Sequence, residues 1–404
     1  MIVSPSRPPR SGSVVVCLDK FRGSATASQA CAWLAAGIRA AAPEVTVVER
    51  PLADGGEGTV EALATVGYSL DRVTVMGPVE GMTVSAALAV RGTEAVVELA
   101  QASGLDLITD AAGAPLTSTT YGTGQLVRRA LDLGCTRIVL AVGGSATTDG
   151  GAGMLTALGA RPYDEFGARL PLGGGYLRDV ASLDLSDLDP RLSSVEFVLA
   201  ADVDSPLLGP EGAAQVFAPQ KGAGPAEIRR LEAGLERFAD LMVLHTGRDH
   251  RSSPGAGAAG GTGFAALTAL QARWRRGSAF MLAELGLARL LRNAALCVVG
   301  EGRFDDQSLR GKAPYGAMTL ARHAGVPVSL VAGDIALPDP RPRPLGTITA
   351  YSLLELAGSP EASFTRTEAL LHTIGERIAA ALDRARPAGS TAGLPEGEGA
   401  GSRG

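Results

Sequence analysis

The stretch "RIVLAVGGSATTDGGAGM", residues 137–154, places a short apolar run in front of a segment that contains five glycines, three hydroxyl residues and one acid. An apolar run followed by a glycine-rich turn and a new helical pattern is typical of a buried parallel strand that leads into a helix. Backbone N–H groups in such turns bind anions, and a carboxylate such as Asp149 can hold Mg²⁺ that bridges phosphate oxygens. A tight turn that needs positive φ, with Asp149 as a helix cap, is the alternative that this stretch alone leaves open.

The composition describes a globular chain with aliphatic cores. At 404 residues the chain exceeds the usual size of one core, so we expect two domains. Glycine is over-represented, with 53 residues that cluster without any fixed period. A net charge of −5 and dispersed Lys and Arg residues argue against nucleic acid or an anionic membrane as a partner.

Cysteine usage and the chain ends point to a cytoplasmic protein. Cys17, Cys31, Cys135 and Cys297 are far apart and form no metal-ligand spacing, so we expect reduced thiols. No apolar core of a signal peptide and no run of eighteen apolar residues occurs. Residues 1–12 and 387–404 are rich in Pro, Ser and Gly and are expected to be disordered.

The pattern of the opening stretch recurs along the chain, which predicts an α/β fold with parallel sheets. Thr26 and Gln29 form a capping-box signature in front of a helix that carries Ala30, Leu34, Ile38 and Ala41 on one face. Alternating residues between 73 and 100 predict antiparallel strands instead. Ligands of parallel sheets bind beyond the carboxyl ends of the strands. The acids of this chain collect at those ends: Asp19, Asp54, Glu57, Asp149, Asp202, Asp204, Glu301, Asp305, Asp306 and Asp334.

Four further segments repeat the combination of glycine with charge: "LADGGEG" (52–58), "ADVDSPLLG" (201–209), "FAPQKGA" (217–223) and "GEGRFDDQSLRGK" (300–312). The last supplies cations for phosphate together with acids for metal binding or proton transfer. Turns, helix caps and solvated surface loops are the alternative readings of each segment taken singly.

The sequence lacks the motifs that are typical of several enzyme classes. The chain has no GxxxxGK[ST] and no HRD/DFG pair, and its four His residues are scattered. "GAGAAG" (255–260) matches GxGxxG, but a polar stretch precedes it where a strand should be. An NAD(P)-dependent sugar-acid oxidoreductase and a non-catalytic anion-binding protein remain as rival interpretations.

Read in order, the segments "DKFRGSATA", "ADGGEGT", "ELAQASGL", "YGTGQL", "GGSATTDGGAGML", "ADVDSPLLGPEGAAQVFAPQKGA", "GAAGGTGFA" and "GEGRFDDQSLRGKAPYGA" resemble the bacterial glycerate kinase family of the glycerate 2-kinase type. The resemblance implies ATP-dependent, Mg²⁺-assisted phosphorylation of D-glycerate, with 2-phosphoglycerate as the product, or of a related small hydroxy acid. It also implies a discontinuous Rossmann-like domain, which we expect over 13–72 and 290–386, with a second α/β domain inserted over 73–289. The sequence leaves open whether the chain forms a homodimer.

Phosphoryl transfer needs positioned phosphates, neutralised charge and an acceptor for the hydroxyl proton. We expect Asp202 to be the base, with Asp305 as its rival, and Asp149 and Asp202 to be the ligands of Mg²⁺. Arg22, which stands where the family usually has Lys, Arg303 and Lys312 are expected to serve phosphates or the glycerate carboxylate. The other expected substrate or nucleotide ligands are Asp19, Asp54, Gly55, Gly56, Gly143, Gly144, Ser145, Thr148, Lys221 and Glu301.

Overall fold

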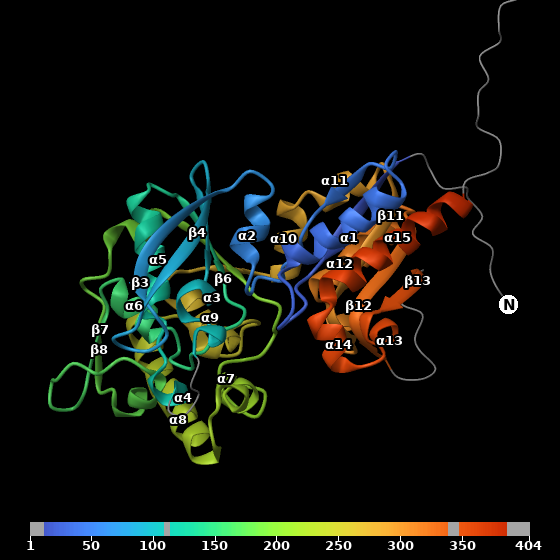
Figure 1. Ribbon diagram of the computed structural model, residues 1–404. Coiled ribbons are helices and arrows are strands. Elements are labelled where there is room, and N and C mark those ends of the chain that lie inside the picture. Colours follow the sequence, from blue (N-terminus) through green and yellow to red (C-terminus); the bar gives the residue numbers. More distant parts are fainter. Residues whose placement is uncertain (1–11, 109–113, 338–346, 386–404) are drawn as a thin grey trace, which may run out of the picture.

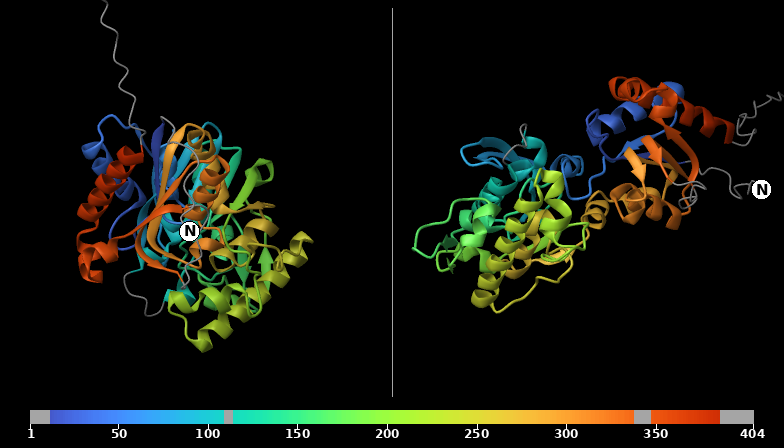
Figure 2. Two further views of the ribbon diagram at one scale, coloured as in Figure 1. Left: turned by 90° about the vertical axis from the view of Figure 1, so that its right-hand side faces the viewer. Right: turned by 90° about the horizontal axis from the view of Figure 1, so that it is seen from below.

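The computed structural model describes residues 12–108, 114–337 and 347–385. The described chain forms two lobes, each built around its own β-sheet (Figures 1 and 2). The expected disordered tails, 1–12 and 387–404, lie outside the described residues except for Gly12. Within the described residues, no helix has both the length and the apolar character that crossing a membrane requires.

The first lobe contains a five-stranded sheet in the order β13–β12–β11–β1–β2, and all its strand pairs are parallel. Its strands are β1 (Ser13–Leu18), β2 (Val47–Glu49), β11 (Ala294–Asp305), β12 (Val328–Ala336) and β13 (Thr347–Ser352). Val14 and Val16 of β1 enter the core on one face, while Val15 and Cys17 enter the core on the other. A strand buried on both faces has to be apolar throughout, which explains the uninterrupted run at its centre.

Helices cover both faces of this sheet. One face carries α1 (Ala27–Ala41), α13 (Leu353–Ala357), α14 (Pro360–Thr365) and α15 (Thr367–Ala385), and the other carries α10 (Gly277–Glu284), α11 (Leu287–Leu291) and α12 (Ala313–His323). The capping box predicted for α1 is present: Thr26 Oγ1 accepts from Gln29 N, and Gln29 Oε1 accepts from Thr26 N. Of the predicted buried face, Ala41 alone is exposed.

The second lobe contains a six-stranded mixed sheet in the order β10–β9–β6–β5–β4–β3. Its strands are β3 (Ser69–Met76), β4 (Thr83–Arg91), β5 (Glu94–Glu98), β6 (Arg137–Ala141), β9 (Glu196–Ala200) and β10 (Arg273–Arg275). The predicted antiparallel strands are β3, β4 and β5, and the remaining pairs are parallel. The predicted α/β class, with antiparallel strands in the inserted part, is therefore confirmed.

The remaining elements belong to the second lobe or to its boundary with the first. The helices are α2 (Thr59–Ala64), α3 (Ala100–Ser103), α4 (Ala114–Thr117), α5 (Tyr121–Asp132), α6 (Ala152–Ala157), α7 (Ala213–Phe217), α8 (Pro225–Thr246) and α9 (Ala258–Thr268). Two short strands, β7 (Arg161–Tyr163) and β8 (Ser182–Asp184), form a separate antiparallel pair. Helix α2 follows β2 in the chain but packs against β3, β4 and β5.

The sheet boundaries differ from those expected for the domains. The boundary expected between 72 and 73 falls inside β3, and the one expected between 289 and 290 falls inside α11. Strand β3 pairs with β4 along its whole length, starting with Ser69 opposite Val90, so the chain enters the second sheet at the turn around Gly67. The sequence signal was weak at the start of β3 because two adjacent charged residues, Asp71 and Arg72, interrupt the alternation of polar and apolar residues.

Helices α1 and α15 cross where two glycines face each other. A Cβ atom on Gly37 would overlap the carbonyl oxygen of His372, and one on Gly375 would overlap that of Leu34. The two helix backbones can approach this closely only because neither position carries a side chain.

We predict that Gly37→Ala lowers the free energy of unfolding by about 1–3 kcal/mol, because the added methyl group has no room. Helix propensity alone predicts the opposite sign, a gain of about 0.5–1 kcal/mol. Denaturant unfolding measures the change, and Ala36→Gly on the exposed neighbouring position reports the propensity effect alone. A more stable Gly37→Ala protein would disprove the close crossing.

Candidate active site

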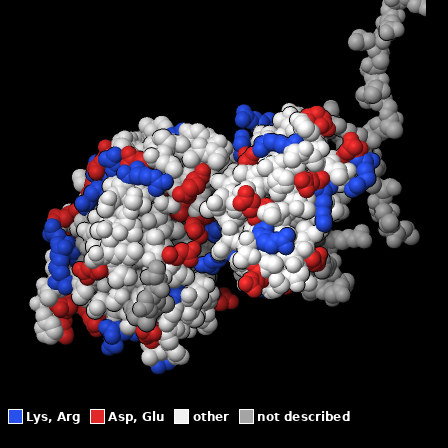
Figure 3. All heavy atoms as spheres, viewed as in Figure 1, with Lys and Arg blue, Asp and Glu red and all other residues white. Residues whose placement is uncertain are grey.

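A cavity of about 640 Å³ lies at the carboxyl ends of strands from both sheets. Its wall is contributed by the segments that follow β1, β2, β5, β6 and β9, together with residues beside α7 and the start of α9. Acidic and basic side chains gather where the two lobes meet (Figure 3). The residues with polar or charged side chains that line the cavity are Lys20, Arg22, Asp54, Glu57, Ser85, Glu98, Gln101, Asp106, Ser145, Asp202, Gln220 and Lys221.

Two glycine-rich loops, one from each lobe, meet at the wall of this cavity. Gly143 N donates to Gly55 O at 3.0 Å, and a Cβ atom on Gly143 would lie 2.5 Å from Gly56 Cα. Gly55 and Gly144 have φ of +91° and +71°, a region that other residues rarely adopt. The glycines of both loops are therefore required for the lobes to come together at this point.

A buried lysine stands beside the second of these loops. Lys221 is 3% exposed, and its Nζ donates to Ser145 Oγ at 3.0 Å and to Thr147 O at 2.5 Å. Among the described residues, no carboxylate lies within ion-pair distance of it. Burial lowers the pKa of Lys221 to about 7, against the smaller opposing effect of Asp149. The cavity wall thus holds a buried lysine that no carboxylate of the described residues contacts.

Three acids form the acidic side of the site: Asp54 and Asp202 line the cavity, whereas Asp19, expected as a ligand, interacts with Asp54 but does not line the cavity. Asp202 accepts hydrogen bonds from Ser278 N and from Ser278 Oγ at 3.0 Å. Burial and the negative charge of Asp54 raise the pKa of Asp202 to about 6. Burial and the same charge of Asp54 raise the pKa of Asp19 to about 7. Repulsion among these carboxylates is offset only in part by their hydrogen bonds.

Ion pairs lie at the rim of the cavity, both between the two lobes and within the first lobe. Arg22, on the loop after β1, pairs with Asp106 of the second lobe at 3.0 Å, and both side chains are exposed. Lys20 Nζ lies 3.4 Å from Glu57 Oε2 and donates to Glu57 O. These cations lie where an anionic ligand would enter, and exposed pairs of this kind contribute little to stability.

Asp149 is buried, and hydrogen bonds from neighbouring residues occupy its carboxylate. It is fully buried, and its oxygens accept from Thr120 N and Oγ1 at 2.8 Å and from the amides of Gly151 and Gly153. It does not line the cavity. The expected role as a Mg²⁺ ligand has no support in this geometry, because the carboxylate oxygens are already engaged in shaping the loop. Thr148, also expected at the site, is buried outside the cavity wall.

The segment 300–305 is not a loop. Strand β11 continues through Asp305, so Arg303 is carried away from the cavity and its exposed side chain lies near Asp305 and Asp334. Asp305 Oδ1 accepts from Gln307 N and Ser308 N in a local turn, and the residue does not line the cavity. The structure therefore gives no support to Asp305 as a base or to Arg303 as a phosphate ligand.

Glu301 and Lys312 form an ion pair of 3.3 Å beside the cavity wall rather than in it. Glu301 is buried, its Oε1 has no hydrogen-bond partner, and its charge contributes to the raised pKa of Asp19. Both residues border the acidic side of the site without lining it.

Sequence reasoning missed Glu98, Gln101, Asp106 and Ser278. Glu98 is the last residue of the buried strand β5, so the rule that singled out Asp54 and Asp202 applies to it equally. Burial raises the pKa of Glu98 to about 7. The hydrogen bonds of Ser278 come from a segment 76 residues away, which no local pattern indicates.

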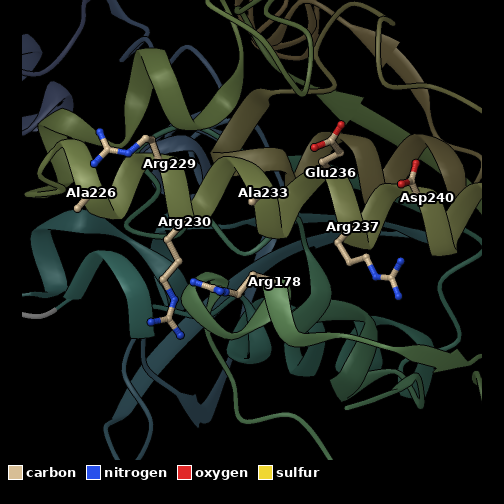
Figure 4. Close-up of a pocket in the computed structure, with 8 residues that line it drawn as sticks. All are labelled: Arg178, Ala226, Arg229, Arg230, Ala233, Glu236, Arg237 and Asp240. Atoms are coloured by element: carbon tan, nitrogen blue, oxygen red, sulfur yellow. The ribbon is translucent and has the colours of Figure 1, made fainter. Parts of the chain in front are cut away.

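A second hollow, of about 600 Å³, lies on the outer face of α8 and is lined by Arg178, Arg229, Arg230 and Arg237 among others (Figure 4). Arg230 and Arg237 donate to the carbonyls of Gly175 and Val180, so they attach the helix to the neighbouring segment.

The "GAGAAG" segment follows α8 and a turn rather than a strand, which removes the support for a dinucleotide fingerprint.

The carboxylate cluster leads to a test of stability. The unfolded pKa of an Asp is about 3.9, below the folded values for Asp19 and Asp202, so ionisation above about pH 4 destabilises the fold. We predict that Asp54→Asn, which keeps the Oδ1 that accepts from Gly56 N, raises the free energy of unfolding at pH 8 by about 1 kcal/mol.

Thermal unfolding of the ligand-free protein between pH 4 and pH 8 measures this effect, which should shrink towards pH 4. Glu165→Gln removes one charge from an exposed position and serves as the control. Equal shifts in the two variants would show that net charge, rather than the cluster, is responsible.

Comparison with known proteins gives a consistent result. The model of the "Glycerate kinase family" matches residues 14–383. A glycerate kinase of Halalkalibacterium halodurans is 40% identical over 370 residues, covering 91% of this chain and 97% of that protein. The glycerate 2-kinase of Escherichia coli is 39% identical over 324 residues, covering 80% of this chain and 85% of that protein. A crystal structure from Salmonella typhimurium LT2 that carries the name glycerate kinase 2 is similar with a TM-score of 0.77 and 37% identity, over 92% of this chain and 98% of that one.

Proposed function

The chain belongs to the glycerate kinase family, and we propose from this and from the cavity that it transfers the γ-phosphoryl group of ATP to D-glycerate, forming 2-phosphoglycerate between the two lobes. The observation that carries the proposal is the cavity itself. It combines Lys221, a buried lysine that no carboxylate of the described residues contacts, with the carboxylates of Asp54 and Asp202. A phosphate-bearing substrate supplies the counter-ion that the lysine lacks, and a carboxylate can accept a hydroxyl proton.

In this proposal the phosphates lie against Gly143, Gly144, Ser145 and Lys221. Lys221 is held in place by Ser145 Oγ and Thr147 O, so its charge is positioned before the substrate binds. Preorganised charge of this kind stabilises the transition state without reorganisation during the reaction. Lys20 and Arg22 at the rim are available for the carboxylate of glycerate.

Asp54 is the residue that would hold Mg²⁺. Among the described residues, no group of three His, Cys, Asp or Glu side chains forms a complete metal site. Mg²⁺ in kinases is usually bound by one or two carboxylates together with the phosphates of the substrate, so the carboxylate of Asp54 in the cavity wall fits it. The ion supplies charge neutralisation on the phosphates.

Asp202 is proposed as the general base that accepts the proton of the attacking hydroxyl group. Its carboxylate is held by Ser278 and lines the cavity, and its pKa of about 6 leaves it ionised at neutral pH. A base whose pKa lies just below the working pH combines the correct protonation state with useful basicity.

A coupled assay tests the reaction and the position of phosphorylation together. We expect the protein, supplied with ATP, D-glycerate and enolase but no mutase, to form phosphoenolpyruvate, because enolase acts directly on 2-phosphoglycerate. If phosphoenolpyruvate formed only after phosphoglycerate mutase was added, the product of the enzyme would be 3-phosphoglycerate and not 2-phosphoglycerate. A panel of other small hydroxy acids in an ADP-release assay decides the substrate class.

We predict that Asp202→Asn lowers kcat by about 100-fold or more, since a general base contributes roughly 10²–10⁴-fold. The fall of kcat/KM below about pH 6 in the unaltered enzyme should be absent in the variant, because protonation of Asp202 causes it. Steady-state kinetics across pH 5–9 measure both effects, with ATP binding followed by calorimetry. Asp204→Asn, on an exposed residue paired with Arg276, is the matched control. Turnover within a few-fold of the unaltered enzyme would assign the base to another residue.

A further inference from the structure

Helix α2 begins without a capping side chain of its own. Its N-cap is Gly58, with φ of +93°, and no side chain of the loop before it accepts a hydrogen bond from the amide of Gly58 or Val60. Amide N–H groups in the first turn of a helix need acceptors from elsewhere. The sequence of the loop, "ADGGEG", therefore leaves the start of this helix dependent on another element.

The acceptor comes from the sheet that α2 packs against. Glu98, fully buried at the end of β5, accepts from Val60 N at 3.0 Å through Oε2 and from Gly58 N at 3.3 Å through Oε1. Gln101 Nε2 donates to the same Oε1 at 3.4 Å and to Glu61 Oε1 at 3.3 Å. A carboxylate at the start of a helix is favourable both as an acceptor and as a charge.

The contact between Glu98 and α2 fixes the position of residues that line the cavity. Asp54, Gly56 and Glu57 immediately precede α2 and line the cavity, so the position of the first turn of α2 sets where their side chains lie. Thr59 Oγ1, inside that turn, donates to Gly56 O at 2.7 Å and transmits the position of the helix to the loop.

We propose that Glu98 is a positioning residue, which binds the first turn of α2 from the end of β5 and so holds Asp54 and Glu57 in the arrangement that phosphoryl transfer requires. The catalytic part of this inference rests on the proposed function. Glu98 also lines the cavity, so the competing role is that of a base. Its oxygens are engaged with two amides and Gln101, which favours positioning.

The test compares Glu98→Gln with Val97→Ala. Gln has the same size but one acceptor oxygen, so one of the two amides loses its partner. Val97→Ala removes buried volume from the same strand on the face that points away from α2, and controls for lost stability. Hydrogen exchange of residues 58–62, without ligand, and steady-state kinetics with ATP and D-glycerate are measured on both.

For Glu98→Gln we expect exchange in residues 58–62 to be at least 10-fold faster and kcat/KM to fall by about 10–100-fold, with the acid limb of the pH profile unchanged. Val97→Ala should leave both close to those of the unaltered protein. If Glu98→Gln does not fold, Glu98→Asp replaces it. Its shorter side chain keeps the charge and both oxygens, so the same changes should appear to a smaller degree.

Unchanged exchange in residues 58–62 would overturn the proposal, as would faster exchange with kinetics no different from the Val97→Ala protein. A loss of more than about 1,000-fold in kcat together with loss of the acid limb would make Glu98 a catalytic base instead. If the unaltered protein did not phosphorylate glycerate, the proposed function would fail and the catalytic part of this inference with it. The exchange result would still decide whether Glu98 holds α2.

Discussion

The contact between the backbones of residues 55–56 and 143 is the constraint on which the site depends. Each loop follows a strand of a different sheet, and the two meet at a hydrogen bond with no room for a Cβ atom between them. Any side chain there would push the lobes apart and separate Asp54 from Ser145 and Lys221, which share one cavity. The glycines that bring the loops together thus act on the chemistry through geometry, without touching the substrate themselves.

The charged groups of the cavity wall neutralise one another only in part. Among the described residues no carboxylate lies within ion-pair distance of Lys221, and the negative charge of Asp54 acts on Asp19 and on Asp202, whose pKa values are raised. This arrangement lowers the stability of the fold, and in the proposed function a ligand that carries phosphates and a cation would offset it. Sites that bind charged transition states commonly have this property.

The fold was predictable because its signals are local: β-branched runs, turn glycines and the capping box at Thr26. The carboxyl ends of parallel strands share one edge, so the same patterns indicated that Asp54, Ser145 and Asp202 lie near one another, whereas Lys221 follows a helix and was expected at the site only through the family resemblance. The patterns misplaced Arg303 and Asp305 because Gly300 and Gly302 resemble the start of a loop. Within β11, however, they allow close approach of Val331 and the segment around Phe21. The patterns could not show that Asp149 turns inward, because the donors from Thr120 lie 29 residues away.

The discontinuous first sheet has a consequence for synthesis. Strand β1 lies between β2 and β11, and β11 emerges from the ribosome only after the whole second lobe. The second lobe can therefore fold as a unit while β1, apolar along its length, still lacks its central neighbour. An unpaired apolar strand is prone to aggregation. Nascent chains stalled before residue 294 should for that reason need a chaperone, whereas those released beyond α15 should not.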